Sequence, residues 1–180
     1  HLLDIHSTSQ DVEPFWVYPG FARNSVAALA IGRPAVHLVM PGGLGSGTPV
    51  IQHGHFGEAS GHGAGMVVEC GQHFLQASAD VAIDVTRRFL AHFGLMAHDP
   101  TWITPEAARR FELLQTVVIK TPGFRFVRPC IGFEVFAKGE LIATDGPDEI
   151  RAPCDDCTIL MPARATIVGR EGVYLSRPLA

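Results

Sequence analysis

Two residues suited to hydrolytic chemistry each close a short apolar segment in the first part of the sequence. His6 follows residues 2–5, and Glu69 follows residues 65–68. Burying an imidazole or a carboxylate among apolar side chains is costly unless the group is paired or used. Either residue alone is more often a hydrogen-bonded structural group. Because open α/β sheets bind ligands at the carboxyl ends of their strands, the two together predict one crevice that holds both side chains.

The segments around these residues alternate between strand and helix patterns. Strands are expected at residues 2–5, 35–40 and 65–70, and helices at 24–32 and about 74–93. One side of the longer helix is apolar, with Leu75, Ala79, Ala82, Phe89, Leu90 and Phe93 at helical spacing. The opposite side carries Asp80, Asp84, Arg87 and Arg88, and Gly94 is expected to end the helix. The alternation predicts an open α/β sheet with helices over residues 1–100.

A glycine-rich stretch with three histidines, residues 41–65, interrupts this pattern. It cannot form a regular core element, and long loops in compact domains are usually functional or mobile. Its segment GLGSG looks like a phosphate loop, but the Lys-Ser/Thr pair of such loops is missing from the sequence.

The pattern changes after residue 100. Residues 96–107 are expected to form a linker, in which Pro105 could open a short helical turn. Short β runs follow, at 113–120, 123–127, 131–137, 140–144, 157–161, 165–169 and 173–176. Turn residues separate them every 8 to 12 positions, which is typical of a small all-β barrel or sandwich. We therefore expect a second domain over residues 105–180.

Composition excludes several classes of partner. A chain of 180 residues, 47% hydrophobic and 18% charged, can form one sizeable domain or two small ones. Its net charge of -4 offers no basic surface for nucleic acid, and its apolar runs are far too short to cross a bilayer.

The four cysteines do not make a disulfide framework, so we expect free thiols in a reducing, cytoplasmic compartment. Cys154 and Cys157 have zinc-knuckle spacing, but no second close pair accompanies them. A plain loop or a redox-sensitive pair is the simpler interpretation.

Two segments resemble a known enzyme family. Residues 4–10, DIHSTSQ, are similar to the strand end that supplies a zinc ligand in zinc carboxypeptidases and in the related succinylglutamate desuccinylase/aspartoacylase family. Residues 67–73, VVECGQH, resemble the Glu-x-Gly segment of that family, and a long amphipathic helix follows in the same order. Residues 149–162 resemble a barrel segment of bacterial members. The resemblance covers residues 2 to about 179.

What the resemblance implies is a zinc-carboxypeptidase-like sheet and a zinc-dependent hydrolase of small N-acyl amino acids. In the family two histidines and a glutamate hold the metal and leave a position open for water. Carried over, His6 becomes a zinc ligand and Glu69 the general base. Asp4, two residues before His6 on the same strand face, is a candidate to orient it. His62 and His73 lie close to this pair and are candidate substrate contacts.

The resemblance also implies two more zinc ligands, in a His-x-x-Glu segment, and substrate-binding arginines, all placed before the histidine strand. Only five residues precede His6, and the sequence does not begin with Met. We therefore interpret it as the C-terminal part of such an enzyme, and expect it to bind zinc weakly and not to turn over substrate by itself.

The glycine-rich stretch offers two alternatives. His55 and Glu58 form a His-x-x-Glu of their own, which on a helix would place both ligands on one face. The spacing of Gly47, His53, His55, Glu58 and Gly65 also nearly matches the first metal motif of the cupin barrels. That site would need strands throughout this region. A third alternative is a non-catalytic binding or assembly module, and the sequence leaves open whether the chain forms a homo-oligomer.

Overall fold

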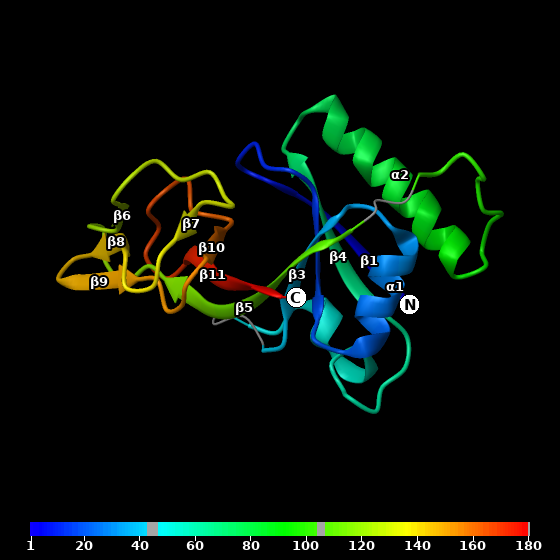
Figure 1. Ribbon diagram of the computed structural model, residues 1–180, viewed down its shortest axis with the longest axis horizontal. Helices are drawn as coiled ribbons and strands as arrows, with labels where there is room; N and C mark the ends of the chain where they lie inside the picture. The colour runs from blue at the N-terminus through cyan, green and yellow to red at the C-terminus, as the bar shows by residue number, and fades with distance from the viewer. Residues whose placement is uncertain (43–46, 104–106, 180) are drawn as a thin grey trace. The chain divides into compact units, whose positions relative to one another are not determined.

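A computed structural model of the chain describes residues 1–42, 47–103 and 107–179. The predicted turn at Pro105 lies outside these residues. The described chain divides into two compact units, with the boundary between Arg110 and Phe111 (Figure 1). Gly47 is grouped with the second unit, and the rest of the glycine-rich stretch from Thr48 on belongs to the first.

The first unit is built on a mixed sheet. Its strands are β1 (Leu2–Thr8), β2 (Phe15–Pro19), β3 (Val36–Met40) and β4 (Gly65–Gln72), in the spatial order β1-β4-β2-β3. β1 runs parallel to β4, β4 antiparallel to β2, and β2 parallel to β3. The prediction of an α/β sheet is confirmed, but β2 was not expected. Trp16 and Tyr18 on β2 are among the most deeply buried side chains of the unit.

Two helices accompany this sheet. α1 (Ala22–Ile31) ends at Gly32, whose φ of 79° is the left-handed conformation that glycine adopts without strain. α2 (Gln76–His92) contacts β4 and β1. In the glycine-rich stretch the described residues form only two short 3-10 turns, η1 (Val50–Gln52) and η2 (Gly54–Phe56).

The predicted inner face of α2 is partly wrong. The buried residues of the helix are Ser78, Val85, Arg88 and Phe89. Leu75, just before the helix, and Ala79 are exposed, although both were expected to be inside. The inner face is therefore rotated toward Val85 and Arg88, and an apolar strip of the helix stays uncovered.

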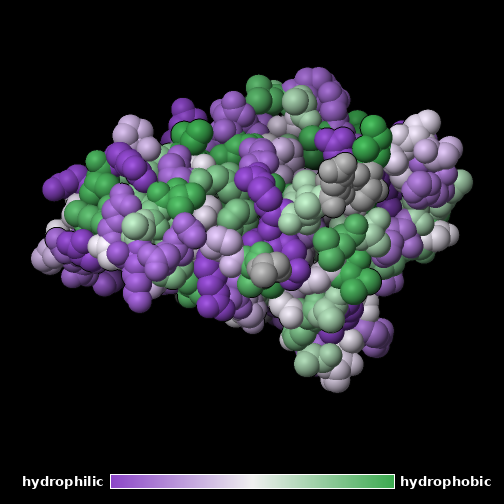
Figure 2. Space-filling model, in the orientation of Figure 1, coloured by the Kyte–Doolittle hydropathy of each residue, from purple (hydrophilic) through white to green (hydrophobic). Residues whose placement is uncertain are grey.

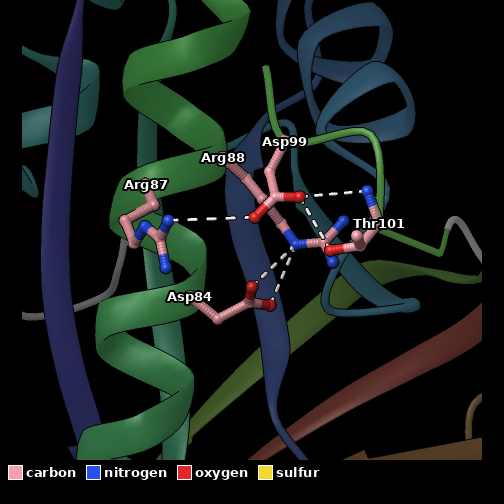
Figure 3. A network of polar contacts seen from close by, with 5 residues as sticks. All are labelled: Asp84, Arg87, Arg88, Asp99 and Thr101. Carbon is pink, nitrogen blue, oxygen red and sulfur yellow. Dashed lines mark hydrogen bonds and ion pairs between the residues drawn. The ribbon is translucent and has the colours of Figure 1, made fainter. Parts of the chain in front are cut away.

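Arg88 is buried because its charge is satisfied locally. Its Nε donates to both carboxylate oxygens of Asp84, at 3.0 and 2.9 Å (Figure 3). Its guanidinium also lies over the ring of Trp102. Nearby, Asp99 accepts hydrogen bonds from Thr101 and pairs with Arg87. This network attaches part of the predicted linker to α2.

The second unit is all β. Its strands are β5 (Arg109–Val118), β6 (Arg125–Phe126), β7 (Val135–Phe136), β8 (Leu141–Asp145), β9 (Asp148–Arg151), β10 (Cys157–Leu160) and β11 (Glu171–Leu179). They form two sheets, β5-β11-β10-β7 and β6-β8-β9. Both contribute to one apolar core that includes Phe136, Ile142, Ile159 and Leu175. The strand expected at 165–169 is absent from the described structure, and β9 was not expected.

Hydrophilic and hydrophobic side chains are interspersed over the face of the molecule seen in Figure 2. Within the described residues, neither helix has the length and apolar character needed to cross a membrane.

Candidate functional site

His6 and Glu69 lie side by side on adjacent strands. β1 and β4 run parallel, and the register places His6 directly opposite Glu69. Nδ1 of His6 is 3.5 Å from Oε1 of Glu69. The histidine side chain is about half exposed, at 49%, whereas that of Glu69 is 9% exposed. The pair thus joins a buried carboxylate to an imidazole that solvent can reach.

One oxygen of Glu69 has no partner. Its Oε2 is buried and accepts no hydrogen bond from any described residue. A buried carboxylate oxygen without a donor is expensive, and native structures usually supply a water, ion or ligand at such a position. Glu69 is therefore equipped to accept a proton or a hydrogen bond from a bound molecule.

Asp4 completes the polar group on this face of β1. Its Oδ2 is 3.2 Å from Nε2 of His6. The hydrogen bond with Glu69 raises the pKa of His6 above its usual value, burial opposes the rise, and the charges of Glu69 and Asp4 add to it. The imidazole is thus held between two carboxylates, one at each ring nitrogen.

The residues present fit only part of a zinc site. Zinc in hydrolases normally takes three protein ligands and one water. Across the part of the chain that the structure describes, no group of three or more His, Cys, Asp or Glu side chains could hold a metal ion. His6 is a suitable single ligand, since its ring is accessible and a carboxylate can fix its orientation.

His73 lies at the carboxyl ends of the same two strands. Its backbone N–H donates to the carbonyl of Thr8, and its Nδ1 is 2.7 Å from Oγ of Ser7. The next residue, Phe74, has a positive φ of 66° and a fully exposed ring. Sequence reasoning named His73 but missed Ser7 and Phe74. The hydroxyl that directly follows His6 in the sequence was the available signal for Ser7.

The histidines of the glycine-rich stretch do not join this pair. His53 lies between the two 3-10 turns and His55 within the second, so neither the helix of the His-x-x-Glu alternative nor the strand of the cupin alternative is formed. The rings of His55 and His62 stack on each other at 5.2 Å.

Arg23 of α1, which sequence reasoning missed, organises this stretch. Its guanidinium donates to the backbone carbonyls of residues 55, 56, 58, 59 and 63. One side chain thereby donates to five backbone carbonyls of the stretch, of which that of Glu58 also accepts from the N–H of Gly61.

The four cysteines and His37 lie outside this polar group. All four cysteines are free thiols, and burial raises the pKa of Cys157 to about 11. His37 is 1% exposed and hydrogen-bonded to Tyr18.

No protein-family model and no curated protein matches the sequence. Solved structures do match the fold. A succinylglutamate desuccinylase from Vibrio cholerae superposes with a TM-score of 0.69 at 18% identity, over 98% of this chain and 52% of its own. The product-bound ectoine utilization protein EutE (DoeB) from Ruegeria pomeroyi gives 0.66 at 16%, over 99% and 57%. A succinylglutamate desuccinylase/aspartoacylase from Rhodobacter sphaeroides gives 0.63 at 16%, over 99% and 58%.

The fold is therefore that of an α/β protein of the desuccinylase type. The resemblance seen in the sequence to the succinylglutamate desuccinylase/aspartoacylase family is confirmed at the level of structure. The chain spans about half the length of the structures it matches, which fits a C-terminal part.

Proposed function

We propose that this chain is part of a zinc-dependent hydrolase that cleaves the amide bond of a small N-acyl amino acid. The observation that carries the proposal is the pairing of His6 with Glu69 across β1 and β4, at 3.5 Å, in a desuccinylase-type fold. The solved neighbours include enzymes named for desuccinylation, which supports an acyl-amide substrate.

Glu69 acts as the general base in this mechanism. Its carboxylate accepts the proton of the attacking water and later passes it to the departing amine. His6 would hold the metal through one ring nitrogen, and Asp4 would orient the ring from the side of Nε2. Zinc, when bound, supplies an acidified water and polarises the scissile carbonyl. His73, held by Ser7, contacts the substrate.

The activity belongs to a whole protein of which this chain supplies one part. The other metal ligands must come from residues other than Asp4, His6 and Glu69, because the described residues include no group of three ligands. The four free cysteines support the proposal of a reducing, cytoplasmic location.

The decisive experiment expresses the complete coding region that contains this chain. Zinc is measured by mass spectrometry, and free amine release is followed from N-acetyl and N-succinyl amino acids. Glu69→Gln is expected to keep the zinc and to lower kcat by roughly 100- to 10,000-fold. His6→Ala is expected to lose the zinc. Glu58→Gln is the matched control, because Glu58 is an exposed carboxylate of the same unit.

Full activity in Glu69→Gln, or zinc retained in His6→Ala, would contradict these roles. A second candidate is a non-catalytic binding module, which the lack of a three-ligand cluster among the described residues favours. Zinc near one equivalent with amine release would reject the module. A zinc-free protein that releases no amine would support it.

A further inference from the structure

β1 presents one side of its backbone to no other strand of the described structure. It lies at the end of the strand order and pairs with β4. The N–H of Leu2 donates to the carbonyl of Ala64, just before β4. Because peptide groups alternate between the two sides of a strand, Leu2, Asp4 and His6 bond toward β4. Leu3, Ile5 and Ser7 therefore direct their N–H and C=O groups to the open edge.

This edge lacks lysine, proline and a covering strand of the described structure, all of which are among the features that protect a permanent edge strand. Natural edge strands usually carry lysine or proline or are covered by another element. Residues 2–8 contain neither residue type, and both faces of the strand carry leucine or isoleucine. Ile5 is 48% exposed. Apolar residues on both faces are typical of an interior strand in a parallel sheet.

A groove lined by both apolar and polar side chains continues this edge on the side of α2. It has a volume of about 390 Å³. Its lining combines the apolar residues Ile5, Cys70, Leu75, Ala79 and Ala82 with the polar residues His6, Ser7, Gln76 and Ser78. The fully exposed ring of Phe74 also lines it. No Asp, Glu, Lys or Arg side chain is among the described residues that line it. Leu75 and Ala79 were expected to be buried from their helical spacing, so the helix is patterned for a partner on this side.

The size of the matching structures indicates the occupant. The superpositions include 98% to 99% of this chain but only 52% to 59% of the matching structures. The unmatched part of such a structure is thus about as long as this chain. An α/β segment of that size can offer both a strand for the edge of β1 and an apolar helix face for the groove.

We propose that the open edge of β1 and the adjoining groove form the docking surface for the remaining α/β segment of the same domain. The segment adds a strand beside Leu3, Ile5 and Ser7 and seats a helix against Leu75 and Ala79. β1 then becomes an interior strand, and His6 gains neighbours on its exposed side. The inference rests on backbone pairing and apolar surface, not on the proposed activity.

Amide exchange measured by NMR tests this surface without any catalytic readout. In the 180-residue chain alone, the amides of Leu3, Ile5 and Ser7 should exchange faster than those of Asp4 and His6, by on the order of 100-fold. In the product of the complete coding region, all five should be protected alike. Fast exchange at Leu3 and Ile5 in that product would overturn the proposal. So would protection in the short chain that disappears on dilution, because the occupant would then be a second copy.

Two variants of the complete product probe the edge and the groove. Ile5→Pro removes an N–H that points away from β4, and should lower Tm in the complete product but little in the short chain. Ile5→Thr keeps the N–H and is the control. Ala79→Lys should likewise destabilise only the complete product, and Ile83→Lys, on an exposed part of α2 outside the groove, is its control. Equal effects of either variant in both forms would reject the docking surface.

Discussion

The phenol oxygen of Tyr18 lies 2.9 Å from Nδ1 of His37, and both side chains are buried in the first unit. Burial lowers the pKa of His37 to about 4, although a hydrogen bond with the backbone of Pro34 opposes the shift. The folded protein therefore holds this imidazole neutral at pH values where the unfolded chain protonates it.

His37 should make the protein less stable in mild acid. Between pH 6.5 and about 4 the unfolded state binds the proton and the folded state does not, so the free energy of unfolding falls as pH falls through this window. The whole shift corresponds to roughly 3 kcal/mol. Urea unfolding at pH 7.5, 5.5 and 4.5 measures the loss.

His37→Gln is the matched variant, because it keeps a polar side chain but cannot titrate. We expect a smaller loss of stability between pH 7.5 and 4.5 in this variant. An identical pH dependence in both proteins would mean that His37 is not the group responsible.

Asp145 should stabilise the second unit through a turn. The carboxylate is 2% exposed and accepts from the backbone N–H groups of Lys120 and Thr121, at 2.6 and 2.9 Å. Asp145→Asn leaves one of these donors facing an amide N–H₂, so we expect a loss of about 1–3 kcal/mol in urea unfolding. Asp148→Asn, which removes an exposed ion pair with Lys120, should cost less than about 1 kcal/mol.

Asp145 should also stabilise the protein less in acid, but its pKa is lowered by hydrogen bonds, whereas that of His37 is lowered by burial. Burial would raise the pKa of Asp145, but the hydrogen bonds from Lys120 and Thr121 outweigh it and hold the pKa below its usual value. Its stabilisation is present above pH 3.8 and is lost as pH falls through the lower folded pKa. Equal losses of stability in Asp145→Asn and Asp148→Asn would contradict the buried role.

Arg23 should control the order of the glycine-rich stretch. Its guanidinium donates to the carbonyls of Glu58, Phe56 and Gly63 at 2.8, 3.0 and 3.0 Å. Arg23→Ala removes the side-chain donor from all three carbonyls and leaves that of Glu58 only the N–H of Gly61, so limited proteolysis should cut residues 53–64 at least several-fold faster. Arg23→Lys keeps the charge but not the fork of donors, so only partial rescue is expected. Unchanged cleavage in Arg23→Ala would show that the stretch is held by other contacts.

The sheet of the first unit was largely predictable, and its exceptions have physical causes. The segments before His6 and Glu69 follow simple apolar patterns, and parallel strands bring their carboxyl ends together. β2 was missed because it is buried on both faces, so its sequence does not alternate between apolar and polar residues. Pro14 directly before it and Pro19 at its end also argue against a strand. Short apolar runs of this kind do not distinguish strand from loop.

Which residues of α2 are buried depends on tertiary contacts that the spacing of apolar residues along the helix does not reveal. Arg88 is inside because Asp84 and the ring of Trp102 satisfy its charge. Leu75 is exposed, and no described strand lies beyond β1 at this edge of the sheet. Similarly, the spacing of the sequence could not indicate that Ser7 would meet His73, since a register shift between β1 and β4 after His6 sets that contact.

The pair of Ser7 and His73 gives a prediction for substrate binding. The hydroxyl of Ser7 fixes the ring of His73 at 2.7 Å, at the carboxyl ends of the strands that carry His6 and Glu69. If His73 contacts the substrate, Ser7→Ala and His73→Gln in the complete product should each raise KM about 5- to 20-fold, as expected for one lost hydrogen bond. Both variants should keep zinc and most of kcat. A fall in kcat with KM unchanged would instead place His73 among the groups that act in the transition state.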